Sequence, residues 1–480
     1  MLLINSTHII GMIITLLVIV GFGLYAGTRV KDERDFAGSS RKGGAAVVAG
    51  TIMGTMVGGN ATIGTAQLAF LYGLDAWWFC IGAGIGFLAL GTFMLRPIYS
   101  SKITTIPEYL VGTYGSGIGP ISSIFTSFGI FFNVIANGLA AVALLTSVVN
   151  LNPTVAVIIT ILITLAYVMA GGIQGTGIVG TVKILLLYAA MIAAAGVALY
   201  QFGGIKAMYH AFPNPFPWFS LFGRGVSRDL AAGFSLVVGV ICTQTYIQAV
   251  AATRSFGKAR LGALLSAFLI PPFGACGVLV GLYMRAHLAG FPGLTTASAQ
   301  VLPVFILHYL PPLFAGVVLA TLFISVIGTI AGLNLGISTM LTRDIYKPYI
   351  AKEVNDQKAL WVQRALILCL CVLAVVCVRG SFGKLLLSFA FLSMGLRGCT
   401  ALFPFLGAMF CKRLVTPAGG IAAAILGPLT DFIWHSLYPK GISSLYPGLM
   451  VSAIVLIVVS LITRKKEDTI GQSKIIGTTR

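Results

Sequence analysis

Charged side chains are scarce in this sequence. Asp, Glu, Lys and Arg make up 9% of its 480 residues, whereas 58% of the residues are hydrophobic. Soluble globular domains carry about 25% charged residues, so this composition argues against a soluble fold. Apolar runs of about 20 residues recur along the chain, each long enough to cross the hydrocarbon core of a bilayer. The alternating segments of about ten residues that are typical of membrane barrels do not occur. The sequence therefore predicts an all-α, polytopic membrane protein.

Several kinds of chemical motif are also missing. The sequence has no GxSxG, HExxH or GK[ST] pattern, which argues against a hydrolase and an ATP-driven pump. Its five histidines are scattered, and its eight cysteines lie in or beside apolar runs without ligand spacing. We expect small, buried, inert thiols, with no disulfide framework, no transition-metal site and no bound cofactor. The protein is predicted not to be an enzyme.

The apolar runs predict thirteen membrane spans. They cover residues 8–27, 44–72, 75–97, 117–149, 153–172, 176–202, 229–252, 261–287, 312–341, 361–379, 383–411, 417–438 and 445–463. The net charge of +19 comes from Lys and Arg in short loops between spans, which indicates membrane topology rather than nucleic-acid binding. Because the loops on one side hold most of these basic residues, we expect the N-terminus outside and the C-terminus in the cytoplasm.

The second span is rich in glycine. Five glycines lie within residues 50–64, and each costs up to about 1 kcal/mol relative to Ala in a helix. An interrupted helix would expose backbone carbonyls to a cation and amides to an anion near mid-membrane. Close helix packing through small residues is the alternative, and Gly54 and Gly58 have the required spacing.

Two other spans carry neutral polar side chains at helical spacing. Gln244 and Gln248 lie one turn apart in the seventh span, and Ser325 and Thr329 share a face of the ninth. Hydrogen bonding between helices is the simple explanation. Neutral oxygens at this depth also suit a hard monovalent cation, so Na⁺ or H⁺ coupling is favoured over a transition metal.

Two basic side chains lie within predicted spans. Arg397 is about ten residues from the nearest end of its span, too far to reach the surface easily, and a buried guanidinium needs a partner. A solute carboxylate would serve; a carbonyl clamp or an internal ion pair, with Asp431 as the candidate acid, is the alternative. Lys183 lies near the inner end of the sixth span, where its side chain could extend to the inner surface.

Four stretches resemble the sodium:solute symporter family, which includes bacterial proline, pantothenate and sugar symporters. Residues 35–41 (DFAGSSR) are similar to its DFxxAGR pattern and residues 167–173 (YVMAGGI) to its YxxxGGL pattern. Residues 244–255 are similar to its QYIIQRxLAAKS pattern, and residues 329–347, ending in LTRDIYK, match its most specific segment. The resemblance covers nearly the full length.

The resemblance implies an inverted-repeat core of five plus five helices, with broken helices at spans 2 and 7. It divides the single transporter domain, 1–480, into an extra helix at 8–27, a first repeat at 44–202, a second at 229–411, two C-terminal helices at 417–463 and a basic cytoplasmic tail at 464–480. It also implies a sodium site whose ligands are the carbonyls of Gly54, Val57 and Ser325 and the hydroxyl of Thr329.

The sequence departs from the family at this site. Gly328 replaces a frequent serine, Val179-Gly180 replaces a frequent Thr-Asp pair, and Met56 replaces a carboxylate found in some members. Lys183 lies one helical turn beyond Gly180, so its ammonium could take the place of Na⁺. Coupling would then be to protons or absent.

We therefore expect a cell-membrane importer of a small organic solute that works by Na⁺ symport and alternating access, with a mild preference for a carboxylate-bearing solute. The alternative is a proton-coupled or Na⁺-independent carrier using Lys183; a channel or a membrane sensor is less favoured. Beyond the solute and the lipid bilayer, neither nucleic acid nor an obligate protein partner is indicated. The candidate solute-pathway residues are Asn60, Ala61, Gln67, Asn133, Asn137, Gln244, Gln248 and Arg397.

Overall fold

The computed structural model describes ten stretches of the chain. They are residues 4–27, 44–101, 103–149, 151–212, 216–253, 255–351, 353, 355–381, 384–438 and 441–477, without the side chains of 20, 22–27, 169–179 and 465–477. Residues 35–41, the first family-like motif, lie outside this description. Every regular element in the described stretches is helical, as predicted.

The α-helices are, in chain order, α1 (Ser6–Gly27), α3 (Ala45–Met56), α4 (Thr65–Tyr72), α5 (Trp78–Ala89), α6 (Leu95–Ser101), α7 (Ile106–Tyr114), α8 (Ile118–Val149), α9 (Pro153–Phe202), α10 (Ile205–His210), α11 (Val226–Ile241), α12 (Gln244–Ala251), α13 (Phe256–Ala286), α14 (Val301–Tyr309), α15 (Pro312–Met340), α16 (Asp356–Arg379), α17 (Leu386–Phe410), α18 (Pro417–Leu437) and α19 (Leu445–Gly477). Short π- or 3₁₀-helical segments join them: η1 (Asn60–Gly64), η2 (Gly73–Trp77), η3 (Leu90–Met94), η4 (Leu288–Gly290), η5 (Pro292–Thr295), η6 (Ser298–Gln300) and η7 (Leu341–Ile350).

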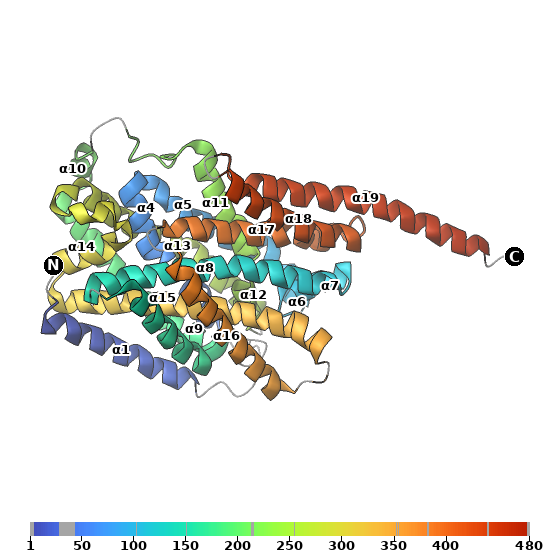
Figure 1. Cartoon of the computed structure of the whole chain (residues 1–480), viewed down its shortest axis with the longest axis horizontal. Coiled ribbons are helices and arrows are strands. Elements are labelled where there is room, and N and C mark those ends of the chain that lie inside the picture. Colours follow the sequence, from blue (N-terminus) through green and yellow to red (C-terminus); the bar gives the residue numbers. More distant parts are fainter. Residues whose placement is uncertain are drawn as a thin grey trace.

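The predicted spans all fall on these helices. Within the described stretches, nine helical runs are long and apolar enough to cross a membrane, and the bent pair α11–α12 makes a tenth. Shorter apolar segments at 6–19, 45–56 and 153–168 account for the three remaining predicted spans. The described starts and ends of the chain lie at opposite ends of the helical bundle (Figure 1), as an odd number of crossings requires.

Helix α9 contains two predicted spans. Its first residue lines a cavity with residues 296–300, and the ring of its last residue, Phe202, contacts Tyr283 and His287. Because residues 287–300 form the short connection between α13 and α14, both ends of α9 lie on one side of the molecule, and the chain crosses twice. The helical assignment nevertheless continues through 173–175, where we predicted a break. The change of direction between these two spans therefore occurs without a non-helical segment.

Both predicted helix interruptions are present. Helix α3 ends at Met56, residues 57–59 are non-helical, and the chain resumes as η1 and α4. A Cβ at Gly58 would lie 2.2 Å from Thr329 Oγ1, so close approach to α15 requires glycine there. Helices α11 and α12 are separated at Cys242 and Thr243 and bend by 43°. The glycine-rich stretch is therefore an interrupted helix.

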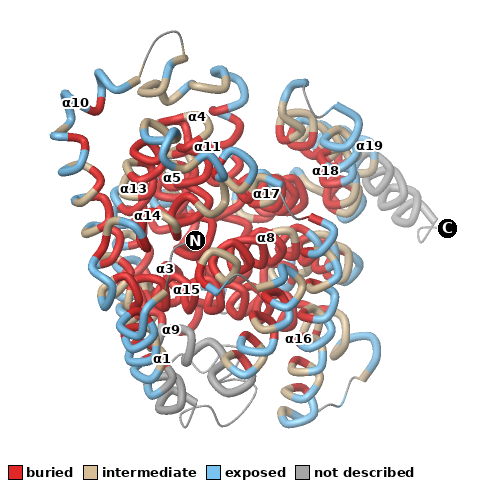
Figure 2. Tube along the Cα trace, turned by 60° about the vertical axis from the view of Figure 1, so that its left-hand side comes forward, coloured by how far each residue is buried: buried red, intermediate tan, exposed pale blue. Residues whose placement is uncertain are grey.

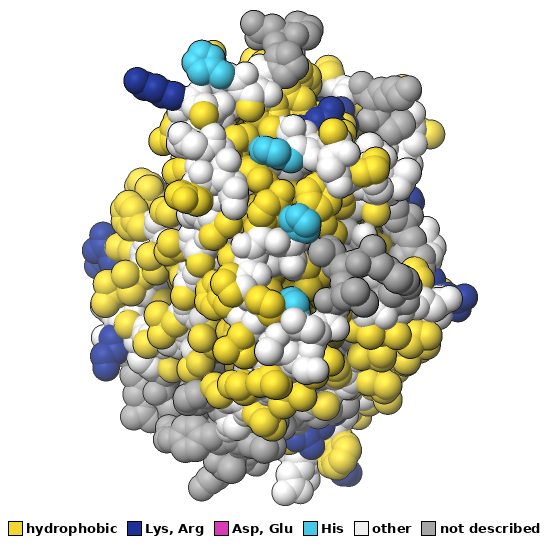
Figure 3. Space-filling view, turned by 90° about the vertical axis from the view of Figure 1, so that its left-hand side faces the viewer, with side chains coloured by type: hydrophobic (Ala, Val, Ile, Leu, Met, Phe, Trp, Pro, Cys, Tyr) yellow, Lys and Arg dark blue, Asp and Glu magenta, His cyan; other side chains and the backbone are white. Residues whose placement is uncertain are grey.

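The interrupted helices lie in the interior. Buried residues concentrate on α3, α8, α15 and α17, whereas α1, α16 and α19 have exposed outer faces (Figure 2). Those faces are apolar, as contact with lipid requires, with Leu17, Leu373, Val376 and Ile462 among the exposed side chains. At the end of the bundle that carries α10 and α14, hydrophobic side chains are mixed with uncharged polar groups, with histidines near the middle and Lys and Arg toward the edges (Figure 3).

Candidate ion and solute site

The four residues that the resemblance implied as sodium ligands meet where α3 is interrupted. Ser325 Oγ donates to the Val57 carbonyl at 2.7 Å, and Thr329 Oγ1 donates to the Gly54 carbonyl at 3.3 Å. Thr329 Oγ1 also lies 3.0 Å from the Ser325 carbonyl, as its position one turn further along α15 predicts. Interrupting α3 leaves the Gly54 and Val57 carbonyls at the negative end of a half-helix, where a cation is stabilised.

The ammonium of Lys183 lies at this position. Lys183 Nζ donates to the Gly54 carbonyl at 2.5 Å and to the Ser325 carbonyl at 3.2 Å. The side chain is 1% exposed, so the expectation that it extends to the inner surface is wrong. The local hydrogen bonds explain the difference, because two backbone carbonyls satisfy the ammonium inside the protein.

Two glycines make room for this lysine. A Cβ at Gly180 would lie 2.3 Å from the Gly50 carbonyl oxygen, so α9 approaches α3 closely one turn before Lys183. A Cβ at Gly328 would lie 3.2 Å from Lys183 Nζ, which leaves little space for the serine frequent in the family. Two of the three departures noted in the sequence therefore lie beside Lys183: Gly328 is next to its ammonium group, and Gly180 lies one turn before it on α9.

Three asparagine side chains form a hydrogen-bonded cluster beside the interrupted backbone. Asn137 Oδ1 accepts from the Gly59 amide at 3.0 Å, while its Nδ2 donates to the Asn133 carbonyl at 2.9 Å. Asn60 Nδ2 donates to Asn133 Oδ1 at 2.5 Å. All three predicted pathway asparagines are thus brought together, and one of them satisfies a backbone donor that the break exposes. Ala61 follows in η1 and is fully buried.

Arg397 is fully buried beside the second interruption. Its Nη1 donates to Thr243 Oγ1 at 2.6 Å, and Thr243 is one of the two residues between α11 and α12. Its Nη2 and Nε donate to the side chain and carbonyl of Ser393 on its own helix, at 2.5 and 3.1 Å. All three partners are uncharged, so these bonds leave the positive charge of the guanidinium without a carboxylate.

Asp431, the acid suggested for an ion pair with Arg397, lies elsewhere. Its Oδ2 lies 3.0 Å from the position of a Cβ at Gly395, on another face of α17. Arg397 donates to Thr243 and Ser393 instead. A pair with Asp431 is therefore not formed in this structure.

The three glutamines differ in their surroundings. Gln67 lies in a cavity of about 350 Å³, where its amide donates to Ser298 Oγ at 3.1 Å and accepts from the Leu386 amide at 3.1 Å. Gln244 bonds the Thr104 carbonyl at 2.8 Å and the Ile106 amide at 3.0 Å, so it fastens α12 to the start of α7. Gln248 is fully buried one turn further along α12.

We assign none of the cysteines a role in binding the ion or the solute. All eight cysteines are free, but Cys369 and Cys411 are exposed rather than buried as expected. Cys369 lies on α16, whose outer face is apolar, and Cys411 is the residue directly after α17.

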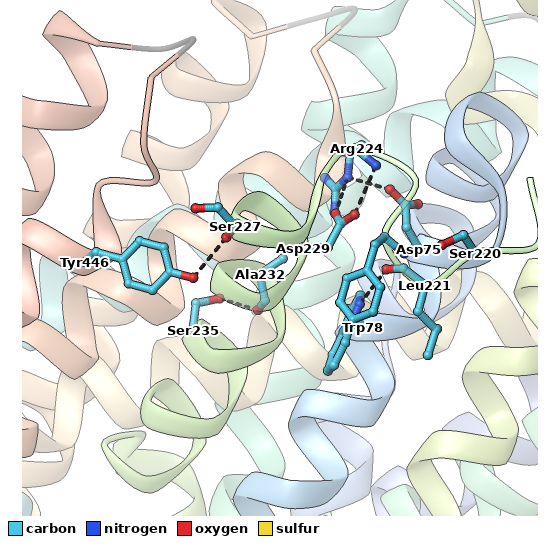
Figure 4. Close-up of polar contacts among 11 residues, drawn as sticks. Asp75, Trp78, Ser220, Leu221, Arg224, Ser227, Asp229, Ala232, Ser235 and Tyr446 are labelled. Carbon is cyan, nitrogen blue, oxygen red and sulfur yellow. Dashed lines mark hydrogen bonds and ion pairs between the residues drawn. The ribbon is translucent and has the colours of Figure 1, made fainter. Parts of the chain in front are cut away.

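Sequence reasoning missed a buried ion cluster beside the first turn of α11. Arg224 Nε lies 2.6 Å from Asp75 Oδ2, and Arg224 Nη2 lies 2.8 Å from Asp229 Oδ1. Figure 4 shows Arg224 between the two carboxylates, one from η2 and one from the first turn of α11. The available signal was the rarity of acids: only twelve occur in the chain, and two of them lie here.

Comparisons with known proteins agree with this architecture. The model of the sodium:solute symporter family matches residues 36–427. The sodium/proline symporter of Haemophilus influenzae is 24% identical over 93% of each chain, and that of Escherichia coli is 23% identical over 96% of this chain and 93% of its own. A solved structure of a Na⁺-coupled sialic acid symporter, substrate-bound and outward-open, superposes with a TM-score of 0.80 at 16% identity, covering 96% of this chain and 98% of the other. That likeness confirms the fold. Because the family model covers most of its length, this multi-pass membrane protein belongs to the sodium:solute symporter family, a family of transporters rather than enzymes.

Proposed function

We propose that the protein imports a small organic solute by alternating access and that the Lys183 ammonium serves as its built-in cation. The observation that carries this proposal is the pair of hydrogen bonds from Lys183 Nζ to the Gly54 and Ser325 carbonyls. Two of the four residues expected to hold Na⁺ thus bind an ammonium instead. One positive charge at the break balances the carbonyl dipoles as a sodium ion would.

This arrangement makes Na⁺ and a protonated Lys183 competitors. Both are monovalent cations that need the Gly54 carbonyl, and two positive charges a few ångströms apart repel strongly at low dielectric. Solute uptake should therefore proceed without Na⁺, with Lys183 either permanently charged or exchanging a proton during the cycle.

Sodium symport is the second candidate. The family and relatives named as sodium/proline symporters indicate Na⁺-coupled solute import. The Val57 carbonyl and the Ser325 and Thr329 hydroxyls are close together, and such oxygens suit a hard cation. Under this candidate, Lys183 must lose its proton or withdraw before the ion binds.

The solute is proposed to carry a carboxylate. Arg397 lies at the second interruption with uncharged hydrogen-bond partners, and a buried charge of this kind is costly unless an opposite charge joins it. A carboxylate can accept two parallel N–H bonds from a guanidinium. Helix α17, which carries Arg397, packs against α11 and also contacts η1, the segment after the first interruption.

Transport by purified protein in liposomes separates the two candidates. A thermal-shift screen of organic acids, amino acids and sugars selects the solute, with L-proline tested first because of the relatives' names. Initial uptake rates are then compared with Na⁺ or K⁺ outside at one fixed pH. The lysine proposal predicts equal rates; strict dependence on Na⁺ would discard it in favour of symport. Saturation and counterflow would distinguish a carrier from a channel.

A further inference from the structure

A second polar cavity lies outside the ion and solute site. It has a volume of about 120 Å³ and is enclosed by α11, α17, α18 and the residues that lead into α19. Tyr446 OH donates to the Ser227 carbonyl at 2.9 Å, which fastens the first turn of α19 to that of α11 (Figure 4). The cavity is therefore built between the second repeat and the two C-terminal helices.

A carboxylate oxygen without a hydrogen-bond donor lines this cavity. Asp431 is 1% exposed, and its Oδ2 has no hydrogen-bond partner among the residues that the structure describes. That oxygen lies 3.0 Å from where a Cβ at Gly395 would stand, and Gly395 lines the same cavity. The Asp431 carboxylate is hydrogen-bonded by the Ser444 side chain, but its Oδ2 stays buried without a donor, which is costly. This oxygen is therefore suited to a positively charged or hydrogen-bond-donating ligand.

The nearby basic groups do not supply that partner. Arg224 lines the cavity but is already bonded to Asp75 and Asp229. Arg228 and His435 are exposed where they line it, whereas Asp431 is buried. The cavity thus has a negative interior and a basic, solvent-exposed rim.

We propose that this cavity binds the ammonium group of a small organic amine, with Asp431 as its counterion. The hydroxyl-bearing residues Ser235, Ser388 and Ser444 line the same space and provide further acceptors. A volume of about 120 Å³ has room for several water-sized groups. That room fits an amine with a short carbon chain better than a bare ion. The basic rim would suit the carboxylate of a zwitterion.

The site is independent of the central one. Asp431 and Arg397 are not paired, and this cavity needs a cation where the second break needs an anion. At the first break the Lys183 ammonium already occupies the cation position, so, on the proposed function, an amine without a carboxylate probes this cavity.

Isothermal titration of the purified full-length protein with ethylammonium chloride tests the proposal. We expect saturable binding that weakens about tenfold or more in Asp431→Asn, which removes the charge but keeps the shape. Gly395→Ala should weaken binding as well, because its methyl group would stand 3.0 Å from Asp431 Oδ2. Glu353→Gln, which makes the same carboxylate-to-amide change at an exposed position outside the cavity, is the matched control and should bind ethylammonium like the natural protein.

A parallel titration with L-alanine distinguishes the source of the amine. If L-alanine binds more tightly than ethylammonium and Arg228→Gln reduces its affinity, the ligand is a zwitterion. If the two bind equally, the ligand is a plain amine. Both results support the ammonium site. Unchanged ethylammonium affinity in folded Asp431→Asn and Gly395→Ala would overturn the proposal. Displacement of ethylammonium by equimolar Na⁺ would also overturn it, because the cavity would then be an ion site.

Discussion

A basic side chain from another helix lies at each of the two helix interruptions, Lys183 from α9 and Arg397 from α17. The two side chains have different hydrogen-bond partners. At the first break, Lys183 donates to the backbone carbonyls of Gly54 and Ser325. At the second, Arg397 donates to the hydroxyls of Thr243 and Ser393 and to one carbonyl of its own helix. Lys183 therefore bonds backbone oxygens that would coordinate a metal ion. Arg397 bonds one side-chain hydroxyl of its break, that of Thr243, and none of the backbone carbonyls there.

From this difference we infer separate roles for Lys183 and Arg397. A flexible ammonium with carbonyl partners from α3 and α15 resembles a bound monovalent cation and holds the two helices together. A guanidinium with uncharged partners retains its attraction for an anion, and its planar shape favours a carboxylate. This is the basis of our proposal that one break binds a cation and the other the solute.

Lys183→Ala should have the largest effect. It leaves the Gly54 and Ser325 carbonyls without a cation, so Na⁺-independent uptake should fall about 100-fold, as expected when two charged hydrogen bonds are lost. Adding Na⁺ should restore uptake, because the vacated oxygens suit that ion. The readout is initial uptake rate in liposomes with and without Na⁺. Lys206→Ala, an exposed lysine, is the control; uptake by Lys183→Ala that matches this control would contradict the assigned role.

Arg397→Gln should have a smaller but still large effect on an acidic solute. Losing one charge-assisted contact should lower kcat/KM about 10- to 100-fold, chiefly through KM. Arg397→Lys should be intermediate because it keeps the charge without the planar fork. Kinetic constants from concentration series in liposomes give the comparison. Unchanged kinetics in Arg397→Gln would remove this residue from the solute site.

Asn137→Leu should have the smallest effect, on stability rather than specificity. The Gly59 amide would lose its acceptor while staying buried, which costs about 1–3 kcal/mol. Thermal unfolding of the purified protein measures the change. Asn355→Ala, which removes an exposed amide acceptor at the start of α16, is the comparison and should cost about 1 kcal/mol. Equal losses in both variants would argue against a special role for Asn137 at the break.

The sequence allowed the helix interruptions to be predicted because their cause is local. Five glycines within residues 50–64 weaken a helix whatever surrounds it, and the spacing of Ser325 and Thr329 places them on one face. The family resemblance then supplied the pairing of the two segments. Those elements meet as expected at the first break.

The position of Lys183 depended on contacts that no spacing reveals. Its distance from the helix end allowed both a surface position and a buried one, and the choice rests on how closely Gly180 approaches Gly50. Gln244 illustrates the same limit, because its partners are backbone groups of residues 104 and 106, far away in the sequence. Arg224 and Asp75 likewise come from separate connections that meet in the folded protein.

Binding of radioactive ²²Na⁺ to the purified protein tests the built-in cation most directly, because it needs no knowledge of the solute. Near neutral pH, the natural protein should bind no Na⁺ at the first break, and Lys183→Ala should gain one saturable site that Thr329→Val weakens. A natural protein that binds one Na⁺ with the same sensitivity to Thr329→Val would contradict the account.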